Sequence, residues 1–205
     1  MKALLWKDLL LEWRNKDAFV AMLAFTLLVF LLFSFAVDSI PRLLKEIAPG
    51  AMWISYLFAG TIGFNRLAFS EKENAAFSSV LLSPLDHSLI YLSKTIVSLI
   101  LIFTVELISL PVLAFFYNID FWKDLPSLLL VLLCASVGMA AIGTLFSTML
   151  VNIRMKDLLM PLLSFPLLTP LLIAAVSLTK AVINGDGFSG QWLQMIITYL
   201  SLIHI

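Results

Sequence analysis

The sequence is poor in charge and in the residues that hold metals or disulfides. Asp, Glu, Lys and Arg make up 13% of its 205 residues, whereas a soluble domain usually carries about 25%. It has one cysteine and two histidines. A single cysteine excludes an internal disulfide framework and a CxxC metal or redox motif. We therefore expect no metal site in this chain.

A nucleotide-binding loop is also missing from the sequence. The pattern GxxxxGK[ST], whose backbone amides hold phosphates, does not occur, and the eight glycines are scattered. Every charged segment is far shorter than the roughly 50 residues of the smallest usual domains. A separate soluble domain is therefore not expected, and if ATP acts on this protein, another chain binds it.

Long runs without any charged residue take up most of the chain. Four of them cover residues 18–37, 47–65, 125–153 and 158–179, and a fifth, 95–119, is broken only by Glu106. A helix that crosses the hydrocarbon core needs roughly 20 mostly apolar residues, and only helices or closed barrels span a bilayer. The runs lack the alternation of barrel strands. We therefore predict an all-α, polytopic membrane helical bundle that forms a single domain over residues 1–205.

Six spans are expected in this bundle, with the sixth incomplete. The sixth apolar stretch runs from Trp192 to the end and has only 14 residues. The last six, LSLIHI (Leu200 to Ile205), match what a sequencing-library adapter would encode, so we expect them to be artefactual and the genuine C-terminus to be missing. The expected spans are about 18–37, 47–66, 94–117, 126–150, 158–179 and 191–205.

The first 17 residues have an amphipathic pattern. At helical spacing the apolar residues share one broad face, and the polar residues share the other. The apolar face comprises Leu5, Trp6, Leu9, Leu10 and Trp13, and the polar face comprises Asp8, Glu12, Asn15 and Lys16. Tryptophan on the apolar face is typical of a helix in the headgroup region. We expect residues 1–17 to form such an interfacial helix; the alternative is a simple extension of the first span.

Basic residues are distributed unevenly between the two ends of the predicted bundle. If the spans alternate in direction, nine of the 13 Lys and Arg residues fall at one end and four at the other. The positive-inside rule places the richer end, which includes the N-terminus, in the cytoplasm. A multi-pass protein with a cytoplasmic N-terminus is therefore expected.

The segment of residues 70–94 is the longest polar interruption between spans. Its charged and apolar candidate positions are Glu71, Glu73, Phe77, Leu81 and Leu82. The apolar ones recur at helical spacing, and Pro84 ends the run because proline disfavours helical geometry in the preceding residue. A short amphipathic helix of this kind can dock into a groove of a soluble partner; alternatively it only covers the bundle.

Three sequence motifs resemble a known class of transport proteins. The charged cluster, the short helix, "LLSPL" and the lysine that opens the next span resemble ABC-2 type permeases. "IAPGAMW" (Ile47 to Trp53) and "MPLLSFPLLTPLLIA" (Met160 to Ala174) resemble the haem exporter protein B family, the CcmB family of cytochrome c maturation. The resemblance covers nearly the whole chain, in the same order and spacing.

The resemblance implies a permease subunit of an ABC-type complex in the bacterial inner membrane. The implied partners are a cytoplasmic ATP-binding subunit, a membrane haem-handling protein, a periplasmic haem chaperone and a second permease copy, with no nucleic acid. Residue by residue, it assigns ATPase coupling to Glu71, Glu73, Phe77, Leu81 and Leu82. An ABC-2 type exporter for a drug, lipid or polysaccharide shares this fold and remains the alternative.

The resemblance leaves open whether haem crosses the bilayer or is released from its chaperone. Haem iron is usually held by His, Cys, Met or Tyr. His87 lies in a connection, and Cys134 lies among Leu and Ala in a span, where packing is its expected role. We therefore favour release, and expect haem only as cargo, with no cofactor bound by this chain.

Several residues inside the spans are candidates for a mechanical role. Glu106 is the only acidic residue well inside a span, so it should face the bundle interior or be protonated. A hydrogen bond to a Ser or Thr of a neighbouring helix is the structural alternative to a functional role. A catalytic role is not expected, since no second acidic or histidine residue accompanies it. The hinge candidates are prolines: Pro111, Pro161, Pro166 and Pro170.

Two further patterns predict contacts between helices or with partners. Ser136, Ala140 and Thr144 repeat every four residues, a spacing that lets helix backbones pack closely within one chain or between two copies. Pro49, Gly50 and Trp53 are candidates for contact with a partner at the outer surface; the alternative is an ordinary interfacial tryptophan anchor.

Overall fold

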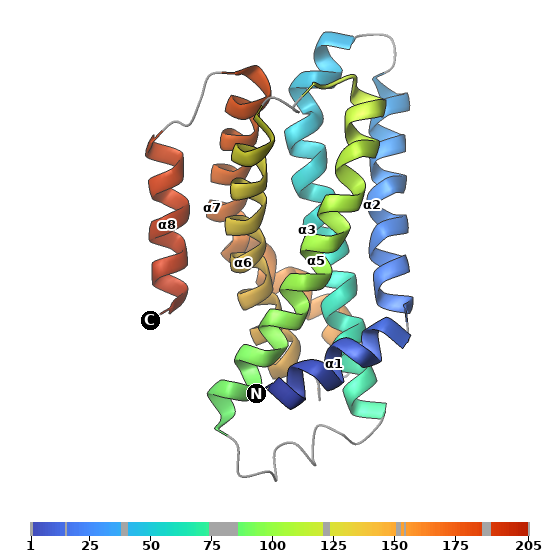
Figure 1. The fold of residues 1–205 in the computed structure, drawn as a ribbon, viewed down its shortest axis with the longest axis vertical. Helices are drawn as coiled ribbons and strands as arrows, with labels where there is room; N and C mark the ends of the chain where they lie inside the picture. Colours follow the sequence, from blue (N-terminus) through green and yellow to red (C-terminus); the bar gives the residue numbers. More distant parts are fainter. Residues whose placement is uncertain are drawn as a thin grey trace.

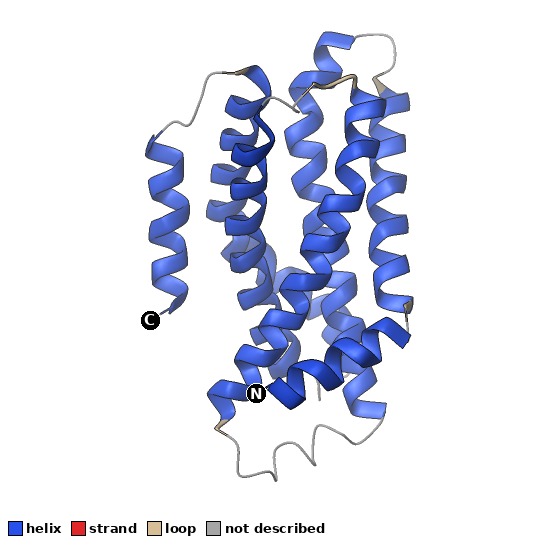
Figure 2. Cartoon of the chain, in the orientation of Figure 1, coloured by secondary structure: helices blue, strands red, loops and turns tan. Residues whose placement is uncertain are grey.

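A computed structural model gives the fold of the chain. It describes residues 2–14, 16–37, 41–73, 86–120, 124–150, 153, 155–185 and 190–204. Within these ranges the secondary structure is helical, joined by short turns, with no strand (Figure 2). The predicted all-α class is confirmed.

Seven helices make up the described part of the chain (Figure 1). They are α1 (Lys2–Arg14), α2 (Asp17–Ala36), α3 (Pro41–Glu73), α5 (His87–Tyr117), α6 (Leu125–Leu150), α7 (Lys156–Asn184) and α8 (Gly190–His204).

Five of these helices are long and apolar enough to cross a membrane. The candidate spans are Asp17–Ala36, Arg42–Asn65, Ser88–Tyr117, Leu125–Leu150 and Leu158–Asn184. Helix α8 has 15 residues, fewer than a full crossing requires. The chain is therefore a multi-pass membrane protein, with a shorter helix at the place of the sixth predicted span.

Two helices extend well beyond the charge-free runs. Helix α3 begins at Pro41 and continues to Glu73, and α5 begins at His87, which therefore opens a helix rather than lying in a loop. A helix need not end where the hydrocarbon ends, because its charged residues can continue into water. The runs thus predicted the membrane crossings more closely than the helix ends.

The five long helices stand side by side, and α1 lies across one end of them (Figure 1). We call this the lower end; the last turns of α2 and α5 and the first turns of α3 and α6 lie at the upper end (Figure 1). Helix α1 packs against α5 and α2. Trp6 is 66% exposed, so part of the apolar face of α1 remains uncovered, as a helix in the headgroup region requires.

Close helix packing in the core depends on glycine. A Cβ atom added at Gly143 of α6 would lie 2.0 Å from Cε2 of Phe64 on α3, and one at Gly138 would lie 2.6 Å from Leu171 on α7. The predicted stripe of Ser136, Ala140 and Thr144 is buried. In this structure α6 therefore uses its small residues against helices of the same chain.

Helix α7 contains three prolines and is nevertheless assigned as one α-helix, Lys156–Asn184. Its orange first part runs obliquely, whereas its red second part is upright (Figure 1). The bend agrees with the expectation that three prolines prevent a straight regular helix. A hinge function for these prolines stays a prediction.

Candidate functional site

A buried polar network in the bundle centres on Glu106 of α5. Glu106 has a relative exposure of 0%, which confirms that this residue faces the bundle interior. Helix α5 provides it because Glu106 falls on the same face as the buried residues Val105, Ser109 and Leu113. A carboxyl group at this depth is costly unless it is paired or protonated.

The partner of Glu106 is a hydroxyl group of the next helix. The Oγ of Ser136 on α6 donates a hydrogen bond of 2.7 Å to Oε2 of Glu106. Ser136 Oγ also lies 2.7 Å from the carbonyl oxygen of Leu132 in its own helix. The other carboxyl oxygen of Glu106, Oε1, is buried and has no hydrogen-bond partner among the described residues.

A tyrosine of α3 joins the same region. The hydroxyl of Tyr56 lies 2.9 Å from the hydroxyl of Ser109, one turn after Glu106, and 3.5 Å from the backbone oxygen of Glu106. Ser109 also donates to that backbone oxygen, at 3.0 Å. Tyr56 and Ser109 have exposures of 1% and 0%. The network therefore connects α3, α5 and α6.

A second hydrogen bond connects α3 to the proline-containing helix α7. The indole Nε1 of Trp53 donates to Oγ1 of Thr179 at 2.9 Å, and both side chains are buried. The Trp53 ring also packs edge-on against Tyr56, with ring centroids 5.9 Å apart and an interplanar angle of 89°. Trp53 and Tyr56 thus place α7 in contact with the network around Glu106.

Helix α2 reaches the network through aromatic rings. Phe30 packs against Tyr56 at a centroid distance of 6.1 Å and against Tyr117 at 6.2 Å. The hydroxyl of Tyr117 donates to the backbone oxygen of Phe30 at 3.2 Å. All five long helices therefore contribute to one buried set of aromatic and polar side chains.

Buried hydrogen bonds join the long helices at this network. Buried hydrogen bonds between spans fix how neighbouring helices are placed relative to each other. Among the described residues no group of three or more His, Cys, Asp or Glu side chains lies where it could hold a metal ion. The network therefore links α7 to α3 through Trp53 and Thr179, and α3 and α6 to α5 through Tyr56 and Ser136.

The predicted hinge prolines do not belong to this network. Pro111 is exposed on α5, Pro166 is exposed on α7, and Pro161 and Pro170 are half-buried. Between them the buried hydroxyl of Ser164 has no partner among the described residues. A buried polar group without a hydrogen-bond partner is energetically costly. The Ser164 hydroxyl therefore lowers the stability of helix packing in the first part of α7.

The predicted outer contact residues take different positions. Pro49 is buried, and Trp53 is 1% exposed inside the bundle, so Trp53 is not the interfacial anchor that the sequence suggested. Its indole N–H instead donates a hydrogen bond to the Thr179 hydroxyl. Gly50 is half-buried, and a Cβ added there would meet nothing within 4 Å. A partner contact at these three residues stays a prediction.

The predicted coupling residues mostly fall outside the described part of the chain. Glu71 and Glu73 lie in the last turn of α3, where the structure describes only the backbone. Phe77, Leu81 and Leu82 lie outside the described residues. Their assignment to ATPase coupling stays a prediction.

A second titratable group is Glu12 of helix α1, which the sequence places on the polar face but which is half-buried in the structure. Burial raises the pKa of Glu12 from 4.5 to about 7, and the nearby carboxylates of Asp8 and Asp17 act in the same direction. Its Oε2 has no hydrogen-bond partner among the described residues. Asp8 itself forms an ion pair with Lys7 at 3.1 Å. Ionisation of Glu12 is therefore disfavoured where α1 lies against the bundle.

Comparison with known proteins identifies the family. The family described as CcmB protein matches residues 1–203. The chain belongs to the CcmB family. The motifs at residues 47–53 and 160–174, which suggested this family from the sequence, thus lie in helices α3 and α7 of a CcmB protein.

Individual relatives are similar over most of their length. A Paracoccus denitrificans protein named Heme exporter protein B is 28% identical over 203 residues, which are 98% of this chain and 93% of the relative. Proteins of the same name from Haemophilus influenzae and Rhodobacter capsulatus are each 26% identical over 90% of this chain, and the matches cover 83% and 84% of those relatives.

Sequence reasoning missed three members of the network. Tyr56, Ser109 and Thr179 lie in charge-free or nearly charge-free runs and were not singled out. Each is a hydrogen-bonding side chain within a candidate span, and such groups usually bond to neighbouring helices. That signal could have selected them as candidates, but not their partners.

Proposed function

We propose that this chain is the membrane permease subunit of an ABC-type complex for haem export or haem delivery in the maturation of c-type cytochromes. The observation that carries the proposal is the match to the CcmB family over residues 1–203, together with relatives named Heme exporter protein B. Five helices able to cross the membrane are consistent with such a subunit.

The proposed partner that supplies energy is a separate cytoplasmic ATP-binding subunit. The chain has no GxxxxGK[ST] loop of its own. We place the lower end of the bundle, with α1 and the coupling segment of residues 70–94, on the cytoplasmic side, because nine of the 13 basic residues belong to that end. Glu71, Glu73, Phe77, Leu81 and Leu82 would contact this subunit.

The remaining proposed partners act in and above the membrane. They are a membrane haem-handling protein, a periplasmic haem chaperone and a second copy of the permease. Haem is proposed as cargo and not as a bound cofactor of this chain. The membrane is the bacterial inner membrane, with the N-terminus in the cytoplasm.

The proposed coupling route runs from the lower end into the polar network. Helix α3 ends at Glu73, within the first residues of the coupling segment, and carries Trp53 and Tyr56 in its buried part. A displacement of α3 driven by the ATP-binding subunit would reach α7 through the bond from Trp53 to Thr179 and α5 through Tyr56 and Ser109. Release of haem from the periplasmic chaperone would follow the movement of α7.

Deletion of the gene tests the proposed function directly. In the organism that carries it, deletion should abolish haem-stained c-type cytochromes and leave b-type cytochromes normal, and a plasmid copy should restore them. Normal c-type cytochromes in the deletion strain would contradict haem delivery and favour the export of another substrate.

A matched pair of substitutions tests the coupling segment. Phe77→Asp should abolish the stimulation of the ATP-binding subunit's ATPase, while the protein still inserts into the membrane. Ser79→Asp places the same charge about half a helical turn away and should keep the stimulation. Normal copurification and stimulated ATPase with Phe77→Asp would refute the assignment.

A further inference from the structure

The carboxyl group of Glu106 lies deep in the bundle. The span of α5 runs from Ser88 to Tyr117, so Glu106 lies about 27 Å from one end and about 17 Å from the other at 1.5 Å per residue. Glu106 is the only buried Asp, Glu, Lys, Arg or His side chain within the described part of the chain. An ionised carboxylate in such a position needs an opposite charge or several hydrogen bonds.

The described helices that pack against α5 bring no cation to the level of Glu106. These helices are α1, α2, α3 and α6. Helix α6 has no charged residue, and α2 has only Asp17, at its first position. The part of α3 between Glu46 and Arg66 has none, and α1 lies across the lower end of the bundle (Figure 1). On α5 itself, Lys94 lies twelve residues before Glu106, which is about 18 Å along the helix.

The other titratable side chains at this level are uncharged near neutral pH. Tyr56 of α3 has its hydroxyl 3.5 Å from the backbone oxygen of Glu106, and Cys134 of α6 is half-buried two residues before Ser136. A tyrosine or cysteine with its ordinary or a raised pKa is mostly protonated at pH 7. Glu106 therefore has no charged neighbour that could offset a negative charge.

The hydroxyl of Ser136 has two close oxygen neighbours but only one proton. Its Oγ lies 2.7 Å from Oε2 of Glu106 and 2.7 Å from the backbone oxygen of Leu132. Both distances are typical of O–H···O hydrogen bonds, and a hydroxyl donates only one. With Glu106 ionised, both neighbours are acceptors and one contact lacks a proton. A proton on Glu106 removes the conflict, because the bond then reverses: Oε2 donates to Oγ, and Oγ donates to Leu132.

The other carboxyl oxygen of Glu106 leads to the same conclusion. Oε1 is buried and has no hydrogen-bond partner among the described residues. In an ionised carboxylate Oε1 shares the negative charge, whereas in the protonated group it is a neutral carbonyl oxygen. Leaving a charged atom unsatisfied costs more than leaving a neutral one unsatisfied. The surroundings of Oε1 therefore suit the protonated group.

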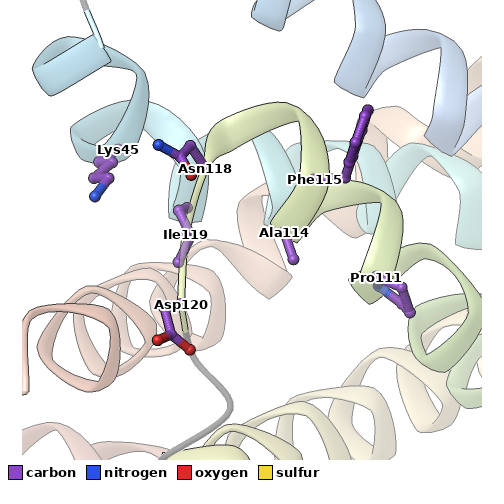
Figure 3. Close-up of a pocket in the computed structure, with 7 residues that line it drawn as sticks. All are labelled: Lys45, Pro111, Ala114, Phe115, Asn118, Ile119 and Asp120. Atoms are coloured by element: carbon purple, nitrogen blue, oxygen red, sulfur yellow. The ribbon is translucent and has the colours of Figure 1, made fainter.

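The site is closed to water in this structure. A hollow of about 560 Å³ at the upper end of α5 does not include Glu106 (Figure 3). Its lining residue nearest to Glu106 along α5 is Pro111, five residues away, which is about 8 Å along the helix axis. Because Glu106 is 0% exposed, a proton on it can leave only when the packing around it changes.

We propose that Glu106 is a proton-binding site, which is filled while α5 and α6 pack as in this structure and is emptied when they separate. On separation the O–H bond of Oε2 breaks, the proton passes to water, and the carboxylate left behind accepts hydrogen bonds from water. The packed state holds one more proton than the separated state, so a rise in pH favours separation. This site is a property of the bundle and does not depend on which substrate the chain handles.

Infrared spectroscopy of the full chain in lipid nanodiscs detects the proton directly. Exposed carboxyl groups have pKa values of about 4, so near neutral pH the band of a protonated carboxyl group reports a buried one. We expect this band in the Glu12→Gln protein, which lacks the half-buried carboxyl group of α1. Adding Glu106→Gln should remove the band, whereas adding Glu46→Gln, at an exposed carboxylate of α3, should keep it.

Ser136→Ala assigns the band without altering the carboxyl group, so the test stands even if Glu106→Gln does not fold. This variant removes the neighbour of Oε2. The band should persist and move to higher frequency, because a carboxyl group without a hydrogen bond has a stiffer C=O bond. Thr169→Ala, which removes an exposed hydroxyl of α7, should leave the band in place.

Thermal unfolding measures the link between the proton and helix packing, because unfolding separates α5 from α6. Both proteins carry Glu12→Gln, and one of them also carries Glu106→Gln. Between about pH 5 and about pH 8 the melting temperature of the protein that keeps Glu106 should fall relative to the other, because only Glu106 must hold a proton to stay packed. The amide of the variant has a similar shape and no charge to lose.

Two results would overturn the proposal. The first is the absence near neutral pH of a protonated carboxyl band that either Glu106→Gln removes or Ser136→Ala shifts, which would show that Glu106 is ionised in the packed bundle. The second is a difference in melting temperature between the two proteins that stays the same at every pH, which would show that packing and proton binding are not linked.

Discussion

The hydroxyl of Ser136 on α6 lies 2.7 Å from Oε2 of Glu106 on α5, and neither side chain is exposed. Among the described residues this is the only hydrogen bond of the Glu106 carboxyl group, because its other oxygen, Oε1, has no partner. Removing one partner of a buried pair costs more than removing both, because a polar group is then left unsatisfied. The pair therefore predicts an asymmetric response to mutation.

Ser136→Ala should lower the free energy of unfolding by about 1–3 kcal/mol, the usual cost of leaving a buried polar group unsatisfied. The same substitution in a Glu106→Leu background should cost much less, because the carboxyl group that needs the hydroxyl is gone. Thermal unfolding of the detergent-solubilised protein measures both. Equal costs in the two backgrounds would show that Ser136 and Glu106 do not depend on each other.

Thr169→Ala is the control for the loss of a serine or threonine hydroxyl in a span. Thr169 is exposed, and its hydroxyl donates only to the carbonyl oxygen of Phe165 in the same helix. Its removal should therefore change the melting temperature little. A loss as large as that of Ser136→Ala would point to a general effect of hydroxyl removal.

Gly143→Ala should destabilise the bundle by about 1–3 kcal/mol, the usual cost of overpacking. The added Cβ would lie 2.0 Å from the ring of Phe64, which is 4% exposed and has little room to move. Phe64→Leu in the same protein should recover part of the loss. Thermal unfolding again measures the effect.

Gly50→Ala is the matched control, since a Cβ there would meet nothing within 4 Å. Alanine is the better helix former by about 1 kcal/mol, so this variant should be as stable as the wild type or more stable. If Gly143→Ala were equally harmless, the close packing of α6 against α3 would be wrong.

The crossings could be predicted from the sequence because the cost of charge in hydrocarbon is a local property. The charge-free runs give the five spans, and the isolated charge of Glu106 predicts its burial without knowledge of any neighbour. The partner of Glu106 could not be chosen in this way. Ser136 was predicted only as part of a small-residue stripe, and its register against α5 depends on how the two helices pack.

The wrong interpretation of Trp53 has the same physical cause. A tryptophan near the end of an apolar run is typical of the interface, but helix α3 starts at Pro41, so Trp53 lies well inside the helix. Its partner Thr179 is 126 residues away in the chain. A contact over such a separation requires the tertiary arrangement, which periodicity and composition do not contain.

Trp53→Phe should lower stability and haem delivery together. The variant keeps an aromatic ring against Tyr56 but loses the donor to Thr179, at a cost of about 1 kcal/mol. Haem-stained c-type cytochromes, normalised to the amount of permease, should fall if the link from α3 to α7 transmits movement.

Thr179→Val removes the acceptor of the same hydrogen bond and serves as the second half of the test. If the link matters, Trp53→Phe and Thr179→Val should give similar losses that do not add in the double variant. Full haem delivery by both variants would separate this hydrogen bond from the transport cycle.

The docking of α1 should weaken as pH rises. The pKa of Glu12 is raised from 4.5 to about 7 by burial and by Asp8 and Asp17, so the ionised carboxylate is disfavoured in the docked state. Below about pH 4.5 both states hold the proton and no cost arises. Between about 4.5 and 7 the docked state loses stability progressively, and above 7 the cost is constant.

Spin labels can follow this transition in the full chain. With Cys134→Ser, labels at Leu11→Cys on α1 and Leu92→Cys on α5, both exposed positions, report the distance between the two helices. The distance distribution should broaden as pH rises from about 5 to about 8 in the otherwise wild-type protein. Glu12→Gln should remain narrow throughout, because its amide has no charge to bury.

Two further variants identify the titrating group. Asp8→Asn removes one of the charges that raise the pKa of Glu12, so the midpoint of the transition should move to lower pH. Glu46→Gln changes an exposed carboxylate near the start of α3, at the other end of the bundle, and should leave the midpoint unchanged. A pH response in Glu12→Gln equal to that of the wild type would assign the transition to another group and refute the role of Glu12.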